Sequence, residues 1–348
     1  MLEQCPQCDE MVLLGTYIER YSLAFYRHSV QMKPILFHER KIDGINAFLL
    51  SHKRFKSLEV MTVIFYRFFA LVLANLTVHQ EVIYRFGEEH GLQYTAFPAR
   101  SMQRITILDV PIDCVAMPSA IERIRALLAD GKKCLVTTPN PEMLVEATRN
   151  PSFRTVLQSA TLALPDGYGL LLVSRMMGKR IPHRVTGTDT MIALCGLSPS
   201  PKVFLLGAAE GVAAAAARVL CVRHPHLQIV GTFSGSPDPA NDTAITHRIN
   251  ASGATLLFVA FGAPTQELWI ARNLPRLTSV RVAMGVGGAF DFVAGKRRRA
   301  PVFVQSLHLE WLWRLLQEPS RVLRIWRAVI VFPMLVLTED RRSLYRRR

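Results

Sequence analysis

The sequence lacks several patterns that mark common enzyme classes. It contains no Walker phosphate loop, no nucleophile elbow and no zinc-protease motif, which argues against an NTPase, an esterase-like hydrolase and a zincin. It also contains no Asp-x-Asp pair of the kind that holds a metal ion beside a nucleotide diphosphate. An enzyme that releases a diphosphate without that pair must neutralise the leaving group with Arg, Lys and backbone N–H donors.

Cysteine is scarce, and a secretory leader is not visible. Six cysteines in 348 residues do not form a dense disulfide framework. The first residues show no positively charged start followed by an apolar run, so we expect a reducing, cytoplasmic location. Cys5 and Cys8 have the spacing of zinc ligands, but no second pair completes a tetrahedral site.

Acidic residues are also scarce, especially near the end of the chain. The formal net charge is +15, which predicts an anionic partner such as a phosphorylated ligand, an anionic lipid or a nucleic acid. Between Lys296 and Arg348, thirteen Lys and Arg residues face four acidic ones, a surplus of nine charges. More than half of the excess charge therefore lies in this segment.

From about Met102 the chain alternates between strands and helices. This pattern predicts an α/β fold: a Rossmann-like, mostly parallel sheet with helices on both faces. Before Met102 the pattern is irregular; Val60 to Val78 is apolar, but Arg67 in its middle favours a buried or interfacial helix over a membrane span. The predicted strands are Ile105 to Val110, Lys133 to Thr138, Leu162 to Leu164, Lys202 to Leu206, Gln228 to Thr232, Thr255 to Phe261 and Val280 to Val286.

Ligands of such sheets bind beyond the carboxyl ends of the strands, so the loops there are the first place to look for chemistry. Thr138 and Asn140 precede a helix that Pro141 opens, where they can bind an anionic or polyol ligand or simply cap the helix. In Leu164-Pro165-Asp166-Gly167 a carboxylate stands beside a glycine that allows close approach. Asp166 is the best-placed general base, although Asp-Gly is also a common turn.

Two further loops carry polar groups. Arg184 precedes Val185-Thr186-Gly187-Thr188-Asp189 and suits a phosphate or carboxylate, whereas Thr188 or Asp189 can cap the following helix. Gly262 and Gln266 follow a strand, and Gln266 can contact a nucleobase or a diphosphate. Gly285-Val286-Gly287-Gly288 also follows a strand, but Phe290-Asp291-Phe292 does not look like a clean helix, which argues against a dinucleotide fingerprint.

The basic end of the chain has an amphipathic pattern. From Trp311 to Ile330, apolar side chains alternate with Arg314, Arg321 and Arg324, which fall on roughly one face of a helix. Such a helix can lie in a membrane interface, where each cation near anionic lipid contributes about 1 kcal/mol. The alternative is the solvated face of a packing helix.

Taken together, the loops in this order resemble the WecG/TagA/CpsF family, glycosyltransferase family 26, from about Met102 to Trp326. The blocks that carry the resemblance are Thr138-Pro139-Asn140, Leu164-Pro165-Asp166-Gly167, Val185-Thr186-Gly187-Thr188-Asp189, Phe204-Leu205-Leu206-Gly207, Gly262-Ala263-Pro264-Thr265-Gln266-Glu267, Gly287-Gly288-Ala289-Phe290-Asp291-Phe292 and the stretch from Leu309-Glu310-Trp311 to Glu318-Pro319. The resemblance implies a Rossmann-like domain over 102–295 and a basic, membrane-associating appendage over 296–348. The segment 1–101 has no counterpart in the family and is treated as an extension.

The resemblance also implies an activity. Members transfer an N-acetylmannosamine-type sugar or a uronic acid from a UDP donor to a polyprenyl-diphosphate-linked acceptor. We therefore expect an inverting, metal-independent transferase at the cytoplasmic face of the membrane, with the UDP-sugar as co-substrate and neither a metal nor a resident cofactor. By resemblance, Asp166 is the base, Thr138 an active-site residue, and Asn140, Arg184, Gln266, Gly262 and Asp189 bind substrate, while Arg314, Arg321 and Arg324 bind the acceptor diphosphate or the membrane.

Two other classes of protein compete with this interpretation. A nucleic-acid-binding protein would use the basic segment, where Arg and Trp can contact phosphates and bases, but it leaves the strand-end loops unexplained. A nucleotide-sugar epimerase or dehydrogenase would need a nicotinamide site. We expect no nucleic-acid partner, and the sequence is compatible with a homo-oligomer.

Overall fold

The computed structural model describes residues 103–301, 304 and 310–346, with side chains up to 339. The predicted extension 1–101, including the apolar run Val60 to Val78 and the Cys5–Cys8 pair, lies outside these residues.

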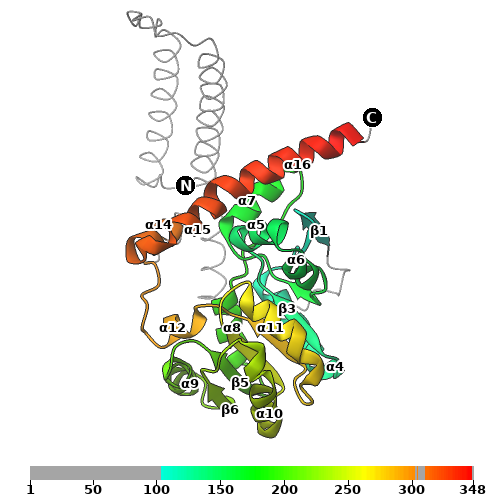
Figure 1. The fold of residues 1–348 in the computed structure, drawn as a ribbon. Helices are drawn as coiled ribbons and strands as arrows, with labels where there is room; N and C mark the ends of the chain where they lie inside the picture. Colours follow the sequence, from blue (N-terminus) through cyan, green and yellow to red (C-terminus); the bar gives the residue numbers. More distant parts are fainter. Residues whose placement is uncertain (1–102, 302–303, 305–309, 347–348) are drawn as a thin grey trace, which may run out of the picture. The chain divides into compact units, whose positions relative to one another are not determined.

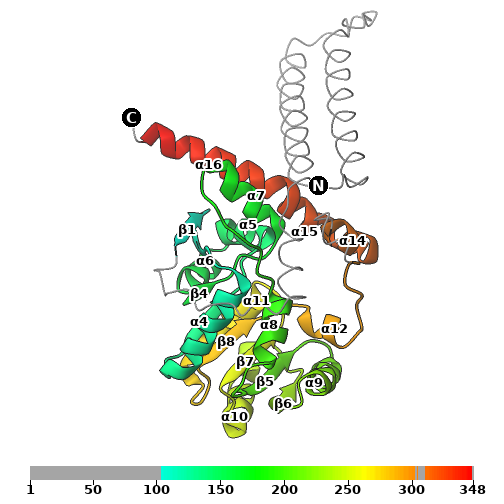
Figure 2. The same ribbon diagram turned by 180° about the vertical axis from the view of Figure 1, so that it is seen from behind.

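A six-stranded sheet forms the centre of the described chain, and all of its neighbouring strands run parallel (Figures 1 and 2). The strand order is β4-β3-β8-β7-β5-β6, so the predicted mostly parallel sheet is confirmed. The strands are β3 (Cys134–Thr137), β4 (Leu162–Ala163), β5 (Lys202–Gly207), β6 (Gln228–Phe233), β7 (Leu256–Ala260) and β8 (Val282–Gly285).

Helices cover both faces of the sheet, as predicted. On one face lie α4 (Met117–Asp130), α8 (Gly187–Cys195), α9 (Val212–Arg223) and α12 (Ala289–Val293), and on the other lie α10 (Asp242–Ser252) and α11 (Thr265–Asn273). The short helix α12 corrects the sequence interpretation, because Phe290-Asp291-Phe292 forms one helical turn. The remaining helices of the domain are α5 (Pro141–Arg149), α6 (Pro151–Gln158), α7 (Tyr168–Met176) and the 3-10 turns η1 (Pro239–Asn241) and η2 (Leu274–Arg276).

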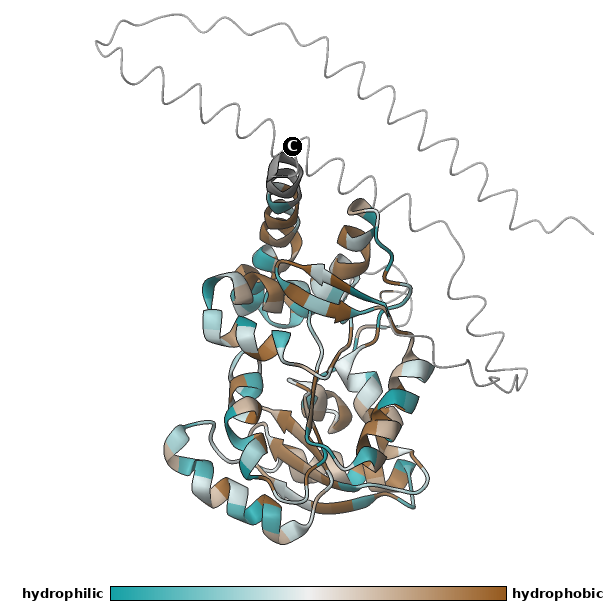
Figure 3. Ribbon diagram, turned by 90° about the vertical axis from the view of Figure 1, so that its right-hand side faces the viewer, coloured by the Kyte–Doolittle hydropathy of each residue, from teal (hydrophilic) through white to brown (hydrophobic). Residues whose placement is uncertain are grey.

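Strand residues alternate between the two cores. Val203 and Leu205 pack against the α4, α8 and α9 face, whereas Phe204 and Leu206 pack against α10 and α11. Successive side chains of a strand point to opposite faces, so a sheet covered on both sides buries continuous apolar runs. The strands are accordingly mostly brown, the colour of apolar residues, in Figure 3.

The predicted strand Ile105 to Val110 is instead a hairpin. Strands β1 (Arg104–Ile107) and β2 (Val110–Asp113) pair antiparallel in a sheet of their own. Leu108 and Asp109 form the turn, with φ of 49° and 60°, a left-handed backbone that closes two-residue hairpins. The βαβ alternation therefore begins at β3.

The basic C-terminal segment is helical, as predicted, but it is not one continuous amphipathic helix. Glu318 leaves the helical conformation (φ −137°, ψ 79°) because it precedes Pro319, and a residue before proline disfavours the helical region. The segment divides into α14 (Glu310–Gln317), η3 (Pro319–Arg321), α15 (Val322–Trp326), a π-helical turn η4 (Arg327–Val331) and α16 (Phe332–Arg346). Within the described part of the chain, no helix is both long and apolar enough to cross a membrane.

The last helix joins a core of the domain. Phe332 and Val336 of α16 are buried in one cluster with side chains of the β1–β2 hairpin, α5, α6 and α7. In Figures 1 and 2, α16 runs across α5 and α7.

A glycine on β6 provides a test of this packing. A Cβ on Gly231 would lie 2.4 Å from an atom of the buried Phe204 ring on β5, so Gly231→Ala forces the ring out of its site. Overpacking of this kind costs about 1–3 kcal/mol. We expect urea denaturation to show that loss. Gly288→Ala is the matched control, because its Cβ meets nothing closer than 3.9 Å; equal stability of the two variants would contradict the prediction.

Candidate functional site

The Asp166 loop is held by backbone hydrogen bonds from both sides. The Asp166 N–H donates to the carbonyl of Pro139 (2.9 Å), and the Val185 N–H donates to the carbonyl of Pro165 (2.8 Å). Gly167 follows with φ of 95°, and a Cβ there would lie 3.1 Å from Pro141. Three of the four predicted loops, those of Thr138, Asp166 and Arg184, therefore meet at the carboxyl edge of β3 and β4.

Thr138 lies at the centre of this junction. Its side chain is buried and would lie 3.4 Å from a Cβ on Gly187, the first residue of α8. The Gly187 N–H in turn points at Asp166 Oδ2, at 3.4 Å. Asn140 caps α5, because its Oδ1 accepts a hydrogen bond from the Met143 N–H at 2.9 Å. The structure therefore gives Asn140 the capping role and leaves its predicted substrate contact as a prediction.

The ionisation of Asp166 is set by competing effects. Burial raises its pKa above the ordinary value, while the charges of Arg184 and Arg314 and the Gly187 N–H oppose the rise. A carboxyl group with a raised pKa holds a proton more readily, which suits general acid–base catalysis near neutral pH.

Arg184 lies between two carboxylates. Its Nη2 contacts Glu310 Oε1 at 2.7 Å, and its charge acts on Asp166. Glu310 opens α14 in the C-terminal segment, so this ion pair joins the basic appendage to the Arg184 loop, which is itself hydrogen-bonded to the Asp166 loop. The sequence placed Glu310 in a family block but gave it no role.

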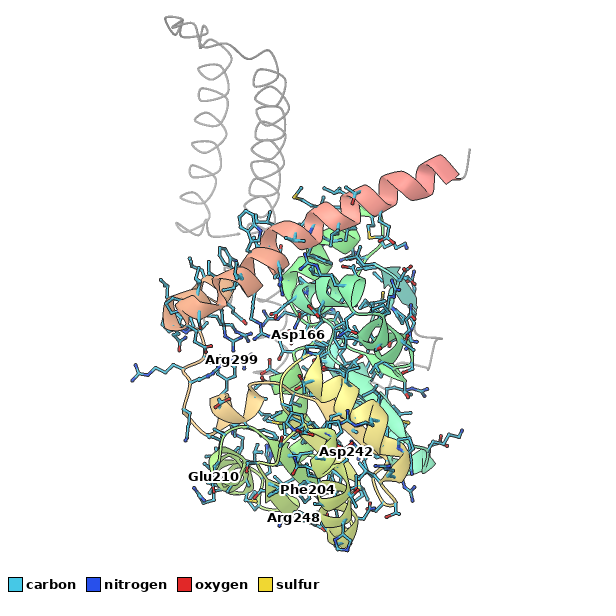
Figure 4. All side chains as sticks on the ribbon, in the orientation of Figure 1. Asp166, Phe204, Glu210, Asp242, Arg248 and Arg299 are labelled. Carbon is cyan, nitrogen blue, oxygen red and sulfur yellow. The ribbon has the colours of Figure 1, made fainter. Side chains whose placement is uncertain are left out.

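A pocket opens over Asp166. In Figure 4, Asp166 and Arg299 lie on the side of the sheet that faces the C-terminal helices, whereas Asp242, Phe204 and Arg248 lie toward the far end. Sequence reasoning missed most of the residues that line this pocket, because they come from segments far apart in the chain. The lining residues are Asp166, Thr186, Thr188, Phe292, Arg298, Arg299, Ala300, Glu310, Trp313 and Arg314.

Asp189 anchors the segment that leads into the appendage. Its two carboxylate oxygens receive the Arg299 guanidinium at 2.6 and 2.8 Å, and the Thr186 hydroxyl donates to Oδ2 at 2.6 Å. Although burial pushes the pKa of Asp189 upward, the hydrogen bonds from Arg299 and Thr186 hold it below its ordinary value. The predicted substrate contact of Asp189 stays a prediction beside this observed ion pair.

Gln266 and Gly262 lie in the fourth loop, which follows β7, and neither of them lines the Asp166 pocket. Gln266 is buried, and its Oε1 accepts hydrogen bonds from the N–H groups of Gly262 (3.1 Å) and Gly287 (3.0 Å). Its Nε2 donates to Oε1 of Glu267 at 2.7 Å. In this structure Gln266 joins the loops that follow β7 and β8, and its contact with a ligand stays a prediction.

The three predicted arginines of the appendage have different surroundings. Arg314 lines the pocket and lies 5.6 Å from the centre of the Phe292 ring. Arg321 pairs with Glu318 and Arg324 pairs with Glu142 of α5 at 2.5 Å. Only Arg314 of the three is among the pocket residues.

The fold is a Rossmann-like α/β fold, and at its strand ends the Asp166 carboxylate lies in a pocket with arginines around it. A comparison with family models matches residues 105–346 to the glycosyl transferase WecG/TagA/CpsF family. The chain belongs to this family and is a glycosyltransferase, as the resemblance implied.

Curated relatives agree with the family match. The chain is 36% identical over 211 residues to an N-acetylglucosaminyldiphosphoundecaprenol N-acetyl-beta-D-mannosaminyltransferase of Bacillus spizizenii, covering 60% of this chain and 79% of the relative. Proteins of the same name from Bacillus subtilis strain 168 and Staphylococcus aureus strain MW2 are 31% and 30% identical, covering 68% and 66% of this chain and 91% and 90% of the relatives.

The buried Glu267 makes stability depend on pH. Burial raises its pKa from 4.5 to about 7, although the hydrogen bond from Gln266 opposes the shift. The folded protein then binds more protons than the unfolded chain between these two values, so the free energy of unfolding falls as pH rises through this window, by about 3 kcal/mol.

Glu267→Gln removes this ionisation. The stability of the variant relative to the native chain, measured by urea denaturation, should therefore rise by that amount between about pH 5 and pH 8. A difference between the two proteins that stays constant with pH would contradict the prediction.

Proposed function

We propose that the chain transfers an N-acetylmannosamine-type sugar from a UDP donor to an N-acetylglucosaminyl-diphosphate carried by a polyprenyl lipid. The activity for which the relatives are named, and their similarity to this chain over most of their length, support this substrate pair. A uronic acid donor is the alternative within the family resemblance. The observation that carries the proposal is Asp166, a carboxylate with a raised pKa that lines a pocket rich in arginine.

The strand order supports a place for the donor. From β5 the chain proceeds outward to β6, whereas from β7 it proceeds the other way to β8, so the order reverses between β5 and β7. Ligands of open α/β sheets bind at such a switch point. We place the nucleoside near the loops after β5 and β7 and the sugar toward Asp166. Neighbouring strands lie about 4.8 Å apart, so β7 and β3 are only roughly 10 Å from each other.

In the proposed reaction, Asp166 accepts the proton of an acceptor hydroxyl. The hydroxyl oxygen forms a bond to the anomeric carbon of the donor as the bond between that carbon and the UDP oxygen breaks, and UDP leaves with the electron pair. A single in-line displacement inverts the anomeric configuration. General base catalysis contributes about 10²–10⁴-fold, and positioning and charge stabilisation supply the rest.

Cations at the pocket suit the phosphates of the substrates. Arg298 and Arg314 line the pocket with Asp166, whereas Arg321 and Arg324 are held by carboxylates. The backbone carbonyl of Arg298 accepts hydrogen bonds from the side chains of Trp313 (3.4 Å) and Gln317 (3.2 Å) of α14. These bonds hold Arg298 beside α14. We propose that Arg298 and Arg314 bind diphosphate oxygens, in a reaction that needs no metal ion and no resident cofactor.

The appendage offers apolar side chains to a membrane surface. Leu316, Leu323, Val322 and Trp326 are 71%, 69%, 54% and 52% exposed. Exposed apolar groups beside arginines are typical of helices that lie in the interface of an anionic leaflet. We therefore propose peripheral association with the cytoplasmic face of the membrane, with 102–295 as the catalytic domain, 296–348 as the appendage and 1–101 as an extension.

The competing function, nucleic-acid binding, explains only the basic charge. Arg324 and Arg299 of the appendage pair with Glu142 and Asp189 of the domain, and Glu310 of the appendage pairs with Arg184, so these charges contact or flank the strand-end loops instead of forming a free basic surface. The membership in a glycosyltransferase family favours the lipid-linked acceptor as the anionic partner.

The base assignment predicts the effect of one substitution. Asp166→Asn should lower turnover at least about 10²-fold, because the amide cannot accept the proton. UDP release is measured with a panel of UDP-sugars, a lipid-diphosphate-linked N-acetylglucosamine acceptor, and chelator present. Asp130→Asn, at the exposed end of α4, is the control. Near-native turnover of the Asp166 variant would contradict the assignment, and the panel identifies the donor.

The assignment of Arg314 to the substrate diphosphate predicts different KM values for two variants. Arg314→Ala should raise the KM for the lipid acceptor by roughly 10-fold or more, since hydrogen bonds to charged groups contribute about 1.5–3 kcal/mol, and should leave binding to anionic liposomes intact. Arg218→Ala, on the exposed face of α9, is the control. An unchanged KM, or a KM that changes as much in the control, would contradict the role of Arg314.

A further inference from the structure

Two adjacent polar side chains are buried at the start of α11. Gln266 is 3% exposed and Glu267 is fully buried. They lie under the end of β8, where a Cβ on Gly285 would lie 2.6 Å from Gln266 Nε2 and 2.7 Å from Glu267 Oε1. Only a glycine at that strand position leaves room for the pair.

The side-chain oxygen of Gln266, Oε1, joins two loops. It accepts hydrogen bonds from Gly262, which follows β7, and from Gly287, which follows β8. The Gly287 loop leads directly into α12, whose Phe292 lines the Asp166 pocket. The position of the Gln266 amide therefore sets the shape of the sheet edge next to the switch point and of one pocket wall.

Glu267 fixes the orientation of that amide. The Gln266 Nε2 donates to Glu267 Oε1, which leaves the Gln266 Oε1 facing the two N–H groups. A rotated amide would place its NH₂ against two N–H donors and its oxygen against a carboxylate, so every contact would become repulsive. The Glu267 carboxylate and the two backbone N–H groups thus favour the same one of two amide orientations.

Burial of Glu267 is unfavourable for folding. Its second oxygen, Oε2, has no hydrogen-bond partner among the described residues, and no charged side chain contributes to the shift of its pKa. A buried carboxylate without a cation costs free energy that an apolar side chain of similar size would not. In exchange for this cost, the carboxylate accepts the hydrogen bond from Gln266 Nε2.

We propose that Glu267 is a positioning residue of the donor site: by orienting the Gln266 amide, it holds the loops after β7 and β8 in the shape that receives the donor's nucleoside diphosphate. This inference rests on the proposed function, which places the nucleoside near the loops after β5 and β7; Gln266 joins the second of these to the loop after β8. Glu267 itself is buried and does not touch the donor.

The test is UDP binding, measured by isothermal titration calorimetry without acceptor on the full chain. Glu267→Leu removes the acceptor for Gln266 Nε2 and should weaken UDP binding about tenfold or more, the loss expected for one charge-assisted hydrogen bond. Glu267→Gln retains a carbonyl at the same place and should bind UDP within about threefold of the native chain near pH 6.

Asn273→Leu is the matched control, since Asn273 is also fully buried but lies at the other end of α11. It should leave UDP affinity unchanged, whatever it does to stability. A loss of UDP affinity in the control as large as in Glu267→Leu would overturn the inference, because the effect would then reflect helix packing.

A pH series tests the inference even where Glu267→Leu does not fold. The ionised carboxylate is the stronger acceptor for Gln266, so UDP binding by the native chain should tighten between about pH 6 and pH 8 relative to Glu267→Gln. Ionisation of UDP itself affects both proteins equally. The same pH dependence in both would overturn the inference. Absence of UDP binding by the native chain would instead contradict the proposed donor, a failure that appears before any variant is made.

Discussion

The candidate site depends on one constraint, the parallel direction of the central strands. Because all six strands end at the same edge, loops that are far apart in the sequence meet there. Backbone hydrogen bonds then set the fine geometry, as the Asp166 N–H and the Pro139 carbonyl illustrate. A catalytic side chain placed by such a rigid frame is already oriented before substrate binds.

Charge pairing decides how the basic appendage is attached. Glu142, Asp189 and Arg184 on the domain meet Arg324, Arg299 and Glu310 on the appendage and its linker. Partly exposed pairs contribute little to stability, typically 0–1 kcal/mol, but opposite charges at fixed positions select one docking orientation among many. The segment 296–348 thereby adds one carboxylate, that of Glu310, and three arginines, Arg298, Arg299 and Arg314, to the lining of the pocket.

Sequence reasoning predicted the fold class and most strands, because covered parallel strands form apolar runs with recognisable ends. It missed the hairpin, since the left-handed turn at Leu108 and Asp109 contains no glycine and nothing in the apolar run marks it. The segment Trp311 to Ile330 was expected as one helix, although Pro319 was visible and breaks it.

For the site, residue type and strand position were enough to single out Asp166, Thr138 and Arg184 as neighbours, and the structure brings their loops together. The partners of Asp189 and Gln266 could not be predicted in this way. Arg299 lies more than a hundred residues from Asp189, and Gly287 lies in the loop of another strand, so both contacts depend on tertiary structure. Glu267 carried no signal because a glutamate in the first turn of a helix is ordinarily exposed.

The shared core of the hairpin, α5, α7 and α16 has a consequence for folding during synthesis. Phe332 and Val336 complete an apolar cluster that begins with the first described strand. The chain is synthesised from its N-terminus, so the early members of that cluster leave the ribosome long before α16. Their apolar surface stays uncovered until α16 follows. This apolar cluster therefore reaches its final packing only after α16 has been synthesised.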